Sequence, residues 1–343
     1  MTIEFRKTMQ YCNVLNPLKE FKEDIITIET RFDPLTGDRC DFPLRPATPQ
    51  KIDQLPIVNK SIELGCPFCI PNVYKVTPKF PPALFPEGRV NRGQAWLVPN
   101  LAPWTEHNPI IVVSEQHYVP FRDFNSRMLA DAFMLSQDYF NRVGEMGNGP
   151  RYKSVIWNYM PPAGGSQIHP HLQMIGQSMP SPIESKIFSA SAAYKKQNSS
   201  IFWQDLIEEE KRLGERYLGD TGQATWLVNY VSRNWLFEIV AIFRERYTIS
   251  DLSEEDWISF GDGLEKVFQY MDDKGLYSFN LSFYSGTDET TDHFYTYVRL
   301  IPRSLFSPVL AADVAAGRLL HDWCFGFLKP EDVCAEAKPY FDR

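Results

Sequence analysis

The sequence lacks the features that would place the protein in a membrane or outside the cell. Its N-terminus, MTIEFRKTMQ, has no apolar run of the kind that forms a signal peptide, and no stretch approaches the 18 apolar residues of a membrane span. The six cysteines follow no regular framework, which excludes a secreted disulfide scaffold. These absences predict a cytoplasmic protein with no membrane partner.

Positive charge is also scarce. The chain has 35 Lys and Arg against 43 Asp and Glu, a formal net charge of −8. This balance argues against nonspecific binding to nucleic acid, so an anionic substrate would need cationic groups placed locally. At 343 residues and 43% apolar content the chain can bury a large core, and its length predicts two domains or one domain of duplicated halves.

Most catalytic patterns are missing as well. No carboxylate pair, Ser–His–Asp order or Walker-type glycine loop suggests a mechanism. What stands out is Ile168–Ile175, where two of the six histidines lie one residue apart and a glutamine follows at the same interval. In a strand, His169, His171 and Gln173 would share one face in steps of about 7 Å. A neutral imidazole is a nucleophile toward phosphorus or a metal ligand, so this stretch predicts either chemistry.

The residues around His171 favour phosphorus chemistry. Gly164, Gly165 and Ser166 come just before the histidines and offer backbone N–H groups and a hydroxyl to phosphate oxygens. Gln173 is a neutral donor that can stabilise a phosphoryl oxygen as charge develops there.

The pair Cys66 and Cys69 predicts a zinc site. Two cysteines at this spacing can converge on one ion, and a tetrahedral structural zinc needs two more ligands. His117 follows a predicted strand, and His169 begins another, so both can reach the cysteines. Four protein ligands close the coordination sphere, which leaves His171 free for chemistry.

The second half of the sequence repeats the order of the first. Each half reads as strand, strand, helix, strand, strand, with the helices predicted at 124–145 and 253–272. His169, His171 and Gln173 align without gaps on Tyr295, Tyr297 and Arg299. We therefore predict an α+β protein of two duplicated halves, each an antiparallel sheet with a helix packed on it. The predicted units are a lead-in at 1–60, a first half at 61–182, a helical connection at 183–222, a second half at 223–310 and C-terminal helices at 311–343.

Together these motifs resemble the galactose-1-phosphate uridylyltransferase branch of the histidine-triad superfamily. The resemblance covers roughly residues 28 to 310 and depends on the following blocks: Arg31-Phe-Asp-Pro-Leu-Thr-Gly37, Cys66-Pro-Phe-Cys69, Val98-Pro-Asn100, Ser114-Glu-Gln-His117, Asn158 with Ser166, and His169-Pro-His171-Leu-Gln173. It implies two histidine-triad-like halves.

The resemblance also implies roles at the matching positions. Zinc would be bound by Cys66, Cys69, His117 and His169. His171 would be the nucleophile, with Gln173 and Ser166 as its catalytic partners. The nucleotide-binding positions would be Arg31, Asn100, Asn158 and Gly165.

Two departures from the family pattern qualify this expectation. The family's second metal site has histidines where this sequence has Tyr297 and Arg299, and a glutamate near the position of Ile187, so no second metal is expected. Leu172 replaces the glycine usual in uridylyltransferases and resembles the dinucleoside-polyphosphate phosphorylases, which leaves the base open between uracil and adenine.

The sequence thus predicts a zinc-containing nucleotidyltransferase that works by double displacement through His171. Its partners would be a nucleotide sugar or dinucleotide and a sugar phosphate or phosphate, with no nucleic acid; a homodimer stays open. The alternatives are an ADP-sugar or dinucleoside-polyphosphate phosphorylase, a hydrolase, and a non-catalytic nucleotide-binding protein. Simple histidine-triad hydrolases have a third histidine at the position of Gln173, which favours transfer.

Overall fold

A ten-stranded antiparallel sheet forms the centre of the molecule. The computed structural model describes residues 3–43, 49, 52–306 and 309–342, so small parts of the predicted lead-in and second half lie outside the described residues. The strand order in the sheet is β4-β5-β6-β8-β7-β12-β13-β11-β10-β9. Its strands are β4 (Val90–Arg92), β5 (Ala95–Val98), β6 (Ile110–Val112), β7 (Tyr152–Tyr159), β8 (His171–Gln177), β9 (Tyr217–Thr221), β10 (Ala224–Val228), β11 (Ile239–Phe243), β12 (Ser278–Tyr284) and β13 (Tyr297–Arg303).

The two halves of the chain contribute five strands each, with the same connectivity. Strands β4 to β8 come from the first half and β9 to β13 from the second, and the halves meet where β7 pairs with β12. The α+β fold with antiparallel sheet and packed helices is confirmed. Each unit begins with one more strand than the sequence predicts, β4 or β9. The duplication itself stays an inference, and the matching connectivity agrees with it.

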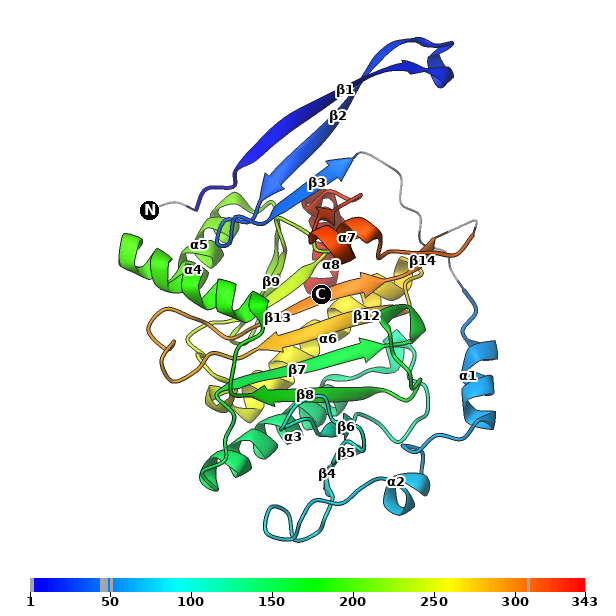
Figure 1. The fold of residues 1–343 in the computed structure, drawn as a ribbon, viewed down its shortest axis with the longest axis vertical. Coiled ribbons are helices and arrows are strands. Elements are labelled where there is room, and N and C mark those ends of the chain that lie inside the picture. The colour runs from blue at the N-terminus through cyan, green and yellow to red at the C-terminus, as the bar shows by residue number, and fades with distance from the viewer. Residues whose placement is uncertain (1–2, 44–48, 50–51, 307–308, 343) are drawn as a thin grey trace.

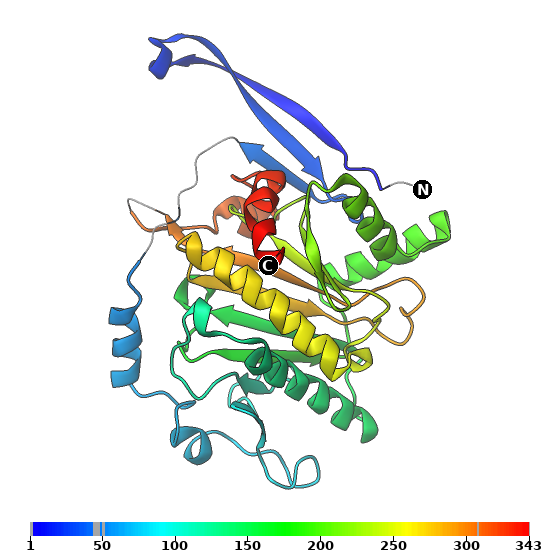
Figure 2. The ribbon, with the colours of Figure 1, turned by 180° about the vertical axis from the view of Figure 1, so that it is seen from behind.

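Two long helices cover one face of the sheet (Figure 2). They are α3 (Ser126–Glu145) and α6 (Glu254–Asp273), at the predicted positions. Asn125 caps α3 by accepting from the Met128 N–H, and Ser253 with Asp256 forms a capping box at the start of α6. A Cβ on Gly261 would lie 2.6 Å from the Ser126 carbonyl oxygen, so glycine is needed where the helices meet.

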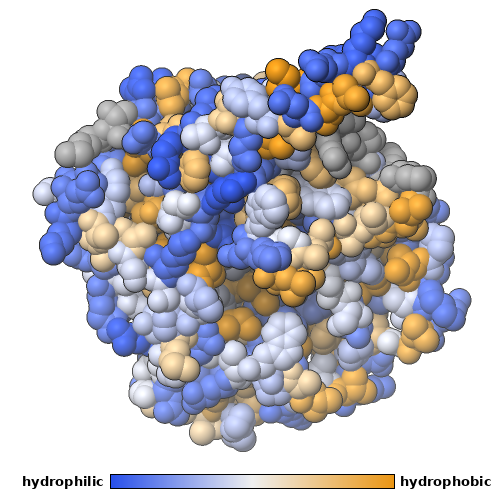
Figure 3. Space-filling model, turned by 45° about the horizontal axis from the view of Figure 1, so that its top comes forward, coloured by the Kyte–Doolittle hydropathy of each residue, from blue (hydrophilic) through white to orange (hydrophobic). Residues whose placement is uncertain are grey.

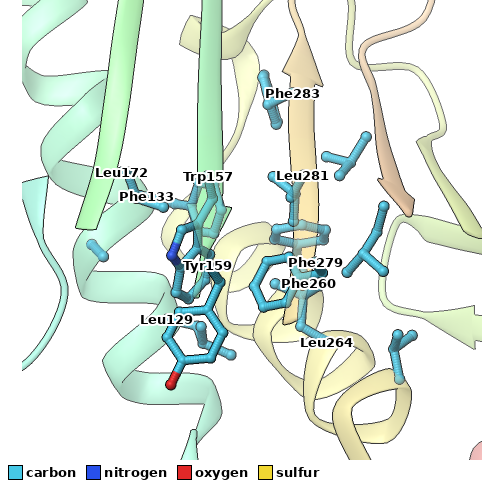
Figure 4. Packing of buried hydrophobic residues seen from close by; sticks show 14 of the residues in the cluster. Leu129, Phe133, Trp157, Tyr159, Leu172, Phe260, Leu264, Phe279, Leu281 and Phe283 are labelled. Atoms are coloured by element: carbon cyan, nitrogen blue, oxygen red, sulfur yellow. The ribbon is translucent and has the colours of Figure 1, made fainter. Parts of the chain in front are cut away.

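The core fills the space between these helices and the sheet (Figure 4). Alternate residues of the central strands face it, including Trp157 and Tyr159 of β7 and Phe279 and Leu281 of β12. Because the two halves share this core, they form one packed body.

The opposite face of the sheet turns toward the viewer in Figure 1, and on the central strands β7 and β12 the side chains of this face are the partly exposed ones. On β7 and β12 these are Ile156, Asn158, Asn280 and Ser282. We call this the open face. A sheet with one packed face and one solvated face shows this alternation.

The predicted lead-in is the main correction to the fold. Residues of this lead-in form a second sheet of β1 (Lys7–Asn16), β2 (Lys22–Phe32) and β3 (Arg39–Pro43), which β16 (Cys324–Phe325) from near the C-terminus completes. The β1–β2 hairpin stands out from the body, and apolar residues such as Tyr11 and Ile25 are exposed on it (Figure 3). Sequence periodicity misses it because the arm buries neither face against the core.

The remaining elements connect these sheets. They are α1 (Leu55–Glu63), α2 (Asn72–Lys75), α4 (Pro182–Asn198), α5 (Phe202–Leu213), β14 (Leu305–Phe306), β15 (Ala311–Ala312), α7 (Ala316–His321), α8 (Pro330–Phe341) and the 3-10 turns η1 (Pro17–Lys19), η2 (Phe121–Asp123), η3 (Pro161–Ala163) and η4 (Ile249–Asp251). The predicted helical connection does contain α4 and α5, but its end belongs to β9. The predicted C-terminal helices alternate with β15 and β16. Among the described residues, no helix is both long and apolar enough to cross a bilayer.

Candidate functional site

The four predicted metal ligands lie together at one end of the first half. Cys66 and Cys69 lie between α1 and α2, His117 follows β6, and His169 precedes β8. One ligand atom from each comes within 4.8 Å of all the others. Segments that are up to 103 residues apart in sequence thus form one Cys2His2 cluster that could bind a metal.

The cluster has the dimensions of a tetrahedral zinc site. His169 Nδ1 lies 3.6 Å from Cys66 Sγ and 3.5 Å from Cys69 Sγ, and His117 Nδ1 lies 3.2 Å from Cys69 Sγ. Zinc bonds of about 2.3 Å to sulfur and about 2.0 Å to nitrogen place tetrahedral S and N ligands about 3.5 Å apart. The donor set and its spacing therefore fit this ion.

Hydrogen bonds outside the cluster orient both imidazoles. His169 Nε2 donates to the Ser114 carbonyl oxygen at 2.7 Å, and His117 Nε2 lies 2.7 Å from Ser61 Oγ. Since a carbonyl only accepts, His169 must be protonated at Nε2 and keeps Nδ1 as the ligand atom. Burial lowers the pKa of His169 to about 4 and also lowers the pKa of His117, so both rings are neutral near pH 7.

The thiols depend on a cation to become ligands. Burial, followed by the neighbouring Cys66, raises the pKa of Cys69 to about 12. A bound divalent ion reverses this preference, because a coordinated thiol is deprotonated. The residues thus fit a metal that is bound with release of protons.

The predicted strand is shorter than expected at its start. β8 begins at His171, so His169 lies outside it, and the prediction that both histidines share one strand face is wrong for His169. The reason is Pro170, which has no N–H for the ladder, although its carbonyl accepts from Val113 N at 2.9 Å.

His171 lies at the start of β8 with one ring nitrogen hydrogen-bonded and the other without a partner in the part of the chain that the structure describes. Its Nδ1 donates to the His169 carbonyl oxygen at 2.9 Å, which leaves the lone pair on Nε2. The ring packs against Phe68, with 5.3 Å between ring centroids, and burial lowers the pKa of His171. The backbone of one metal ligand therefore sets the tautomer of the candidate nucleophile.

Gln173 and Asn158 accompany His171 on the open face. Gln173 is paired with Ile156 in the β7–β8 ladder, and the same antiparallel register puts Asn158 beside His171. Gln173 Oε1 is buried and has no hydrogen-bond partner among the described residues. The three side chains form a polar row on this face.

The Gly-Gly-Ser loop differs from its predicted use. The N–H groups of Gly164 and Gly165 donate to the carbonyls of Pro161 and Met160, so they are not free for a phosphate. Gly165 is needed because a Cβ there would lie 2.7 Å from the Asn158 carbonyl oxygen. Ser166 is exposed at the loop.

Asn100 and Arg31, which are predicted to bind the nucleotide, make hydrogen bonds to other side chains of the protein. Asn100 lies after β5, where its amide donates to Asn108 Oδ1 at 2.9 Å and holds a loop with the exposed Leu101 and Trp104. Arg31 lies in the N-terminal sheet and is 3% exposed. Its guanidinium makes bonds of 2.9 and 2.8 Å to Glu331, so we assign it a structural role.

The equivalent place in the second half is filled by aromatic rings. Tyr297 stacks on Trp203 at 4.4 Å and on Tyr284 at 4.8 Å between centroids. Arg299 is paired with Glu238 at 2.5 Å. These contacts surround the two residues that align with His171 and Gln173 of the first half.

The sequence-based prediction missed Asn280 of β12. Its Nδ2 donates to Asn158 Oδ1 at 2.6 Å, across the boundary between the halves. The repeat aligns β7 with β12 but does not tell which strands pair, so no sequence signal pointed to this contact.

Comparison with solved structures shows which proteins share this fold. A GalT-like protein from Arabidopsis thaliana matches with a TM-score of 0.69 at 17% identity, covering 90% of this chain and 98% of that one. An ADP-glucose phosphorylase from Arabidopsis thaliana, with bound ADP-glucose, matches with a TM-score of 0.71 at 15% identity, covering 91% and 98%. A uridylyltransferase matches with a TM-score of 0.66 at 17% identity, covering 91% and 98%.

This chain has a GalT-like fold. The fold that the predicted resemblance implies is thus confirmed. An uncharacterized protein of Archaeoglobus fulgidus is 29% identical over 337 residues, 98% of each chain. No protein-family model matches the sequence.

Proposed function

We propose that this GalT-like protein is a nucleotidyltransferase that transfers a nucleoside monophosphate between phosphate acceptors by way of His171. The observation that supports this best is the free Nε2 lone pair of His171, fixed by the 2.9 Å hydrogen bond of Nδ1. Its neighbours Gln173 and Asn158 offer amide donors on the same face of the sheet. The solved relatives include a uridylyltransferase and an ADP-glucose phosphorylase.

In the first step Nε2 attacks the α-phosphorus of the donor. A P–N bond forms, the P–O bond to the leaving phosphate breaks, and the leaving oxygen keeps the electron pair. Amide donors from Gln173 and Asn158 stabilise the phosphoryl oxygens as charge develops. In the second step an acceptor phosphate oxygen attacks the same phosphorus, the P–N bond breaks, and His171 regains its lone pair.

The metal in this proposal is one zinc ion at Cys66, Cys69, His117 and His169. A closed set of four protein ligands gives it a structural role, because no position remains for water. What it supports is the His169 backbone, whose carbonyl fixes the ring of His171. The free cysteines of the chain fit a reducing compartment such as the cytoplasm.

The donor is a nucleoside diphosphate sugar in the favoured form of the proposal, with UDP-glucose and a hexose 1-phosphate as the pair implied by the uridylyltransferases. The alternative is an adenylyl donor, either an ADP-sugar or a dinucleoside polyphosphate, with phosphate as the acceptor. Leu172, which resembles the phosphorylases, supports this alternative.

Labelling with donors tests the proposal. UDP-glucose, UDP-galactose, ADP-glucose and diadenosine tetraphosphate, each labelled at the α-phosphate, are incubated with the protein. One of them is expected to leave acid-labile label on a peptide containing His171, and the acceptor should remove it. If no donor labels the protein while His171→Asn binds nucleotide as tightly as the wild type, the protein is a non-catalytic nucleotide-binding protein. If water removes the label from His171 as fast as the acceptor does, the protein is a hydrolase.

A further inference from the structure

Asn280 connects the second half of the molecule to the candidate site in the first. It lies on the open face of β12, directly opposite Asn158 of β7 in the antiparallel register. The two amides meet where the halves join. Asn158 in turn lies beside His171 on β8.

The orientation of the Asn280 amide is determined by Arg303. Arg303 Nη1 donates to Asn280 Oδ1 at 2.6 Å. Because a guanidinium has no acceptor, the amide oxygen must face Arg303 and the amide nitrogen must face away. Arg303 is itself held by Asp313, which accepts from its Nε at 2.8 Å and from its Nη2 at 2.6 Å and is 5% exposed.

Both hydrogens of the Asn280 amide are used. One goes to Asn158 Oδ1 at 2.6 Å and the other to the Ala163 carbonyl oxygen at 2.8 Å. The oxygen of Asn158 is thereby turned toward β12, and its Nδ2 toward the other side. Across the described ranges, Asn158 Nδ2 donates to no protein group. The Ala163 bond also fixes the start of the loop that ends at Ser166.

We propose that Asn280 is a positioning residue, held by Arg303 and Asp313, that turns the Nδ2 donors of Asn158 toward the phosphoryl group transferred to His171. This inference depends on the proposed function, and it adds a role for the second half in that chemistry. With Asn280 in place, Asn158 presents two N–H groups to the phosphoryl oxygens. Without it, the amide can turn and present its oxygen, which repels them.

The variant Asn280→Asp tests the inference, because it keeps the size of the side chain and the acceptor for Arg303 but has no N–H. We expect the rate of nucleotidyl-His171 formation to fall on the order of 100-fold, with donor affinity and melting temperature close to those of the wild type. The matched control is Ser282→Ala, at the next outward-facing position of β12, and it should leave the rate within about twofold. An unchanged rate in Asn280→Asp overturns the inference.

A double-mutant cycle separates positioning from general damage. In an Asn158→Ala background, Asn280→Asp should lower the rate by less than about twofold, since the group that it positions is gone. If the two losses add in full, Asn280 acts by another route and the inference is wrong.

The orientation can be measured even if the protein transfers nothing. Side-chain amide NMR with UMP and AMP as probes should show the Asn158 Nδ2 protons shifting on binding in the wild type and not in Asn280→Asp. Equal shifts in both proteins would overturn the inference. Absence of labelling of the wild type by every donor, with the NMR difference present, would reject the proposed function and keep the orientation.

Discussion

The two halves use the same strand order for different purposes. In the first half β8 presents His171 and Gln173 on the open face, next to a cluster of four metal-ligand side chains. In the second half β13 presents Tyr297 and Arg299 at the equivalent places. The ring of Tyr297 is stacked on both sides, and Arg299 is paired with Glu238.

The difference teaches that the scaffold does not by itself make a site. Among the described residues, the first half keeps a lone pair on His171 Nε2 and an amide oxygen on Gln173 without hydrogen-bond partners on this face of the sheet. The other half uses the same positions for packing and ion pairing. The second half nevertheless reaches the chemistry through Asn280, which only strand pairing brings beside Asn158.

Exchanging the nucleophile is the strongest test of this comparison. We expect His171→Asn to reduce nucleotidyl transfer by roughly 1,000-fold or more, because no other side chain at the site can form the covalent intermediate. The matched change in the other half, Tyr297→Phe, should leave the rate within about twofold. Transfer is measured with the labelled donor that marks the wild type. Comparable losses in both variants would contradict the assignment of chemistry to one half.

Removing the metal ligand should damage stability in the first half. Purified protein is expected to contain one zinc ion per chain, and Cys66→Ser should lose it and more than about 5 kcal/mol of unfolding free energy. Cys12→Ser, at an exposed position, is the control and should change neither. Metal analysis and denaturant unfolding measure the outcome. A Cys66→Ser protein that keeps both its zinc and its stability would remove the basis for the site.

In the second half, aromatic packing around Tyr297 should contribute to stability as the metal site does in the first. Trp203 is 5% exposed and stacks on Tyr297 at 4.4 Å, so Trp203→Ala is expected to cost about 3–5 kcal/mol of unfolding free energy. The zinc content should stay at that of the wild type. If Trp203→Ala also lost its zinc, the metal site of the first half would depend on the aromatic packing around Tyr297.

An acid titration sharpens the comparison further. Burial acts to raise the pKa of Glu331, but hydrogen bonds and charge from Arg31, with Arg216, outweigh it and lower this pKa to about 2. The stabilisation by this ion pair is therefore complete above the ordinary pKa of about 4.5 and is lost as the pH falls toward 2, up to roughly 3 kcal/mol. Denaturant unfolding between pH 7 and pH 2.5 measures this loss of unfolding free energy. In Glu331→Gln this part of the loss should be absent. An identical pH profile in both proteins would show that Glu331 titrates normally.

Much of the fold was predictable because local patterns determine it. Helical periodicity placed α3 and α6 to within about two residues. The β1–β2 arm was missed, because a hairpin that is exposed on both faces over most of its length has little alternation to detect. The predicted start of β8 was wrong, because Pro170 before His171 has no N–H to donate to the neighbouring strand.

The sequence by itself determined which atoms can do chemistry. Cys66, Cys69, His117 and His169 are the residue types that bind zinc, and a histidine beside them is the type that attacks phosphorus. Tertiary structure decided how those atoms are presented. The N–H groups of Gly164 and Gly165 donate to carbonyls within their own loop. Arg31 is buried in an ion pair with Glu331, and Asn280 orients the amide of Asn158. Hydrogen-bond partners are chosen by strand register and packing between distant segments, and a local pattern does not contain that information.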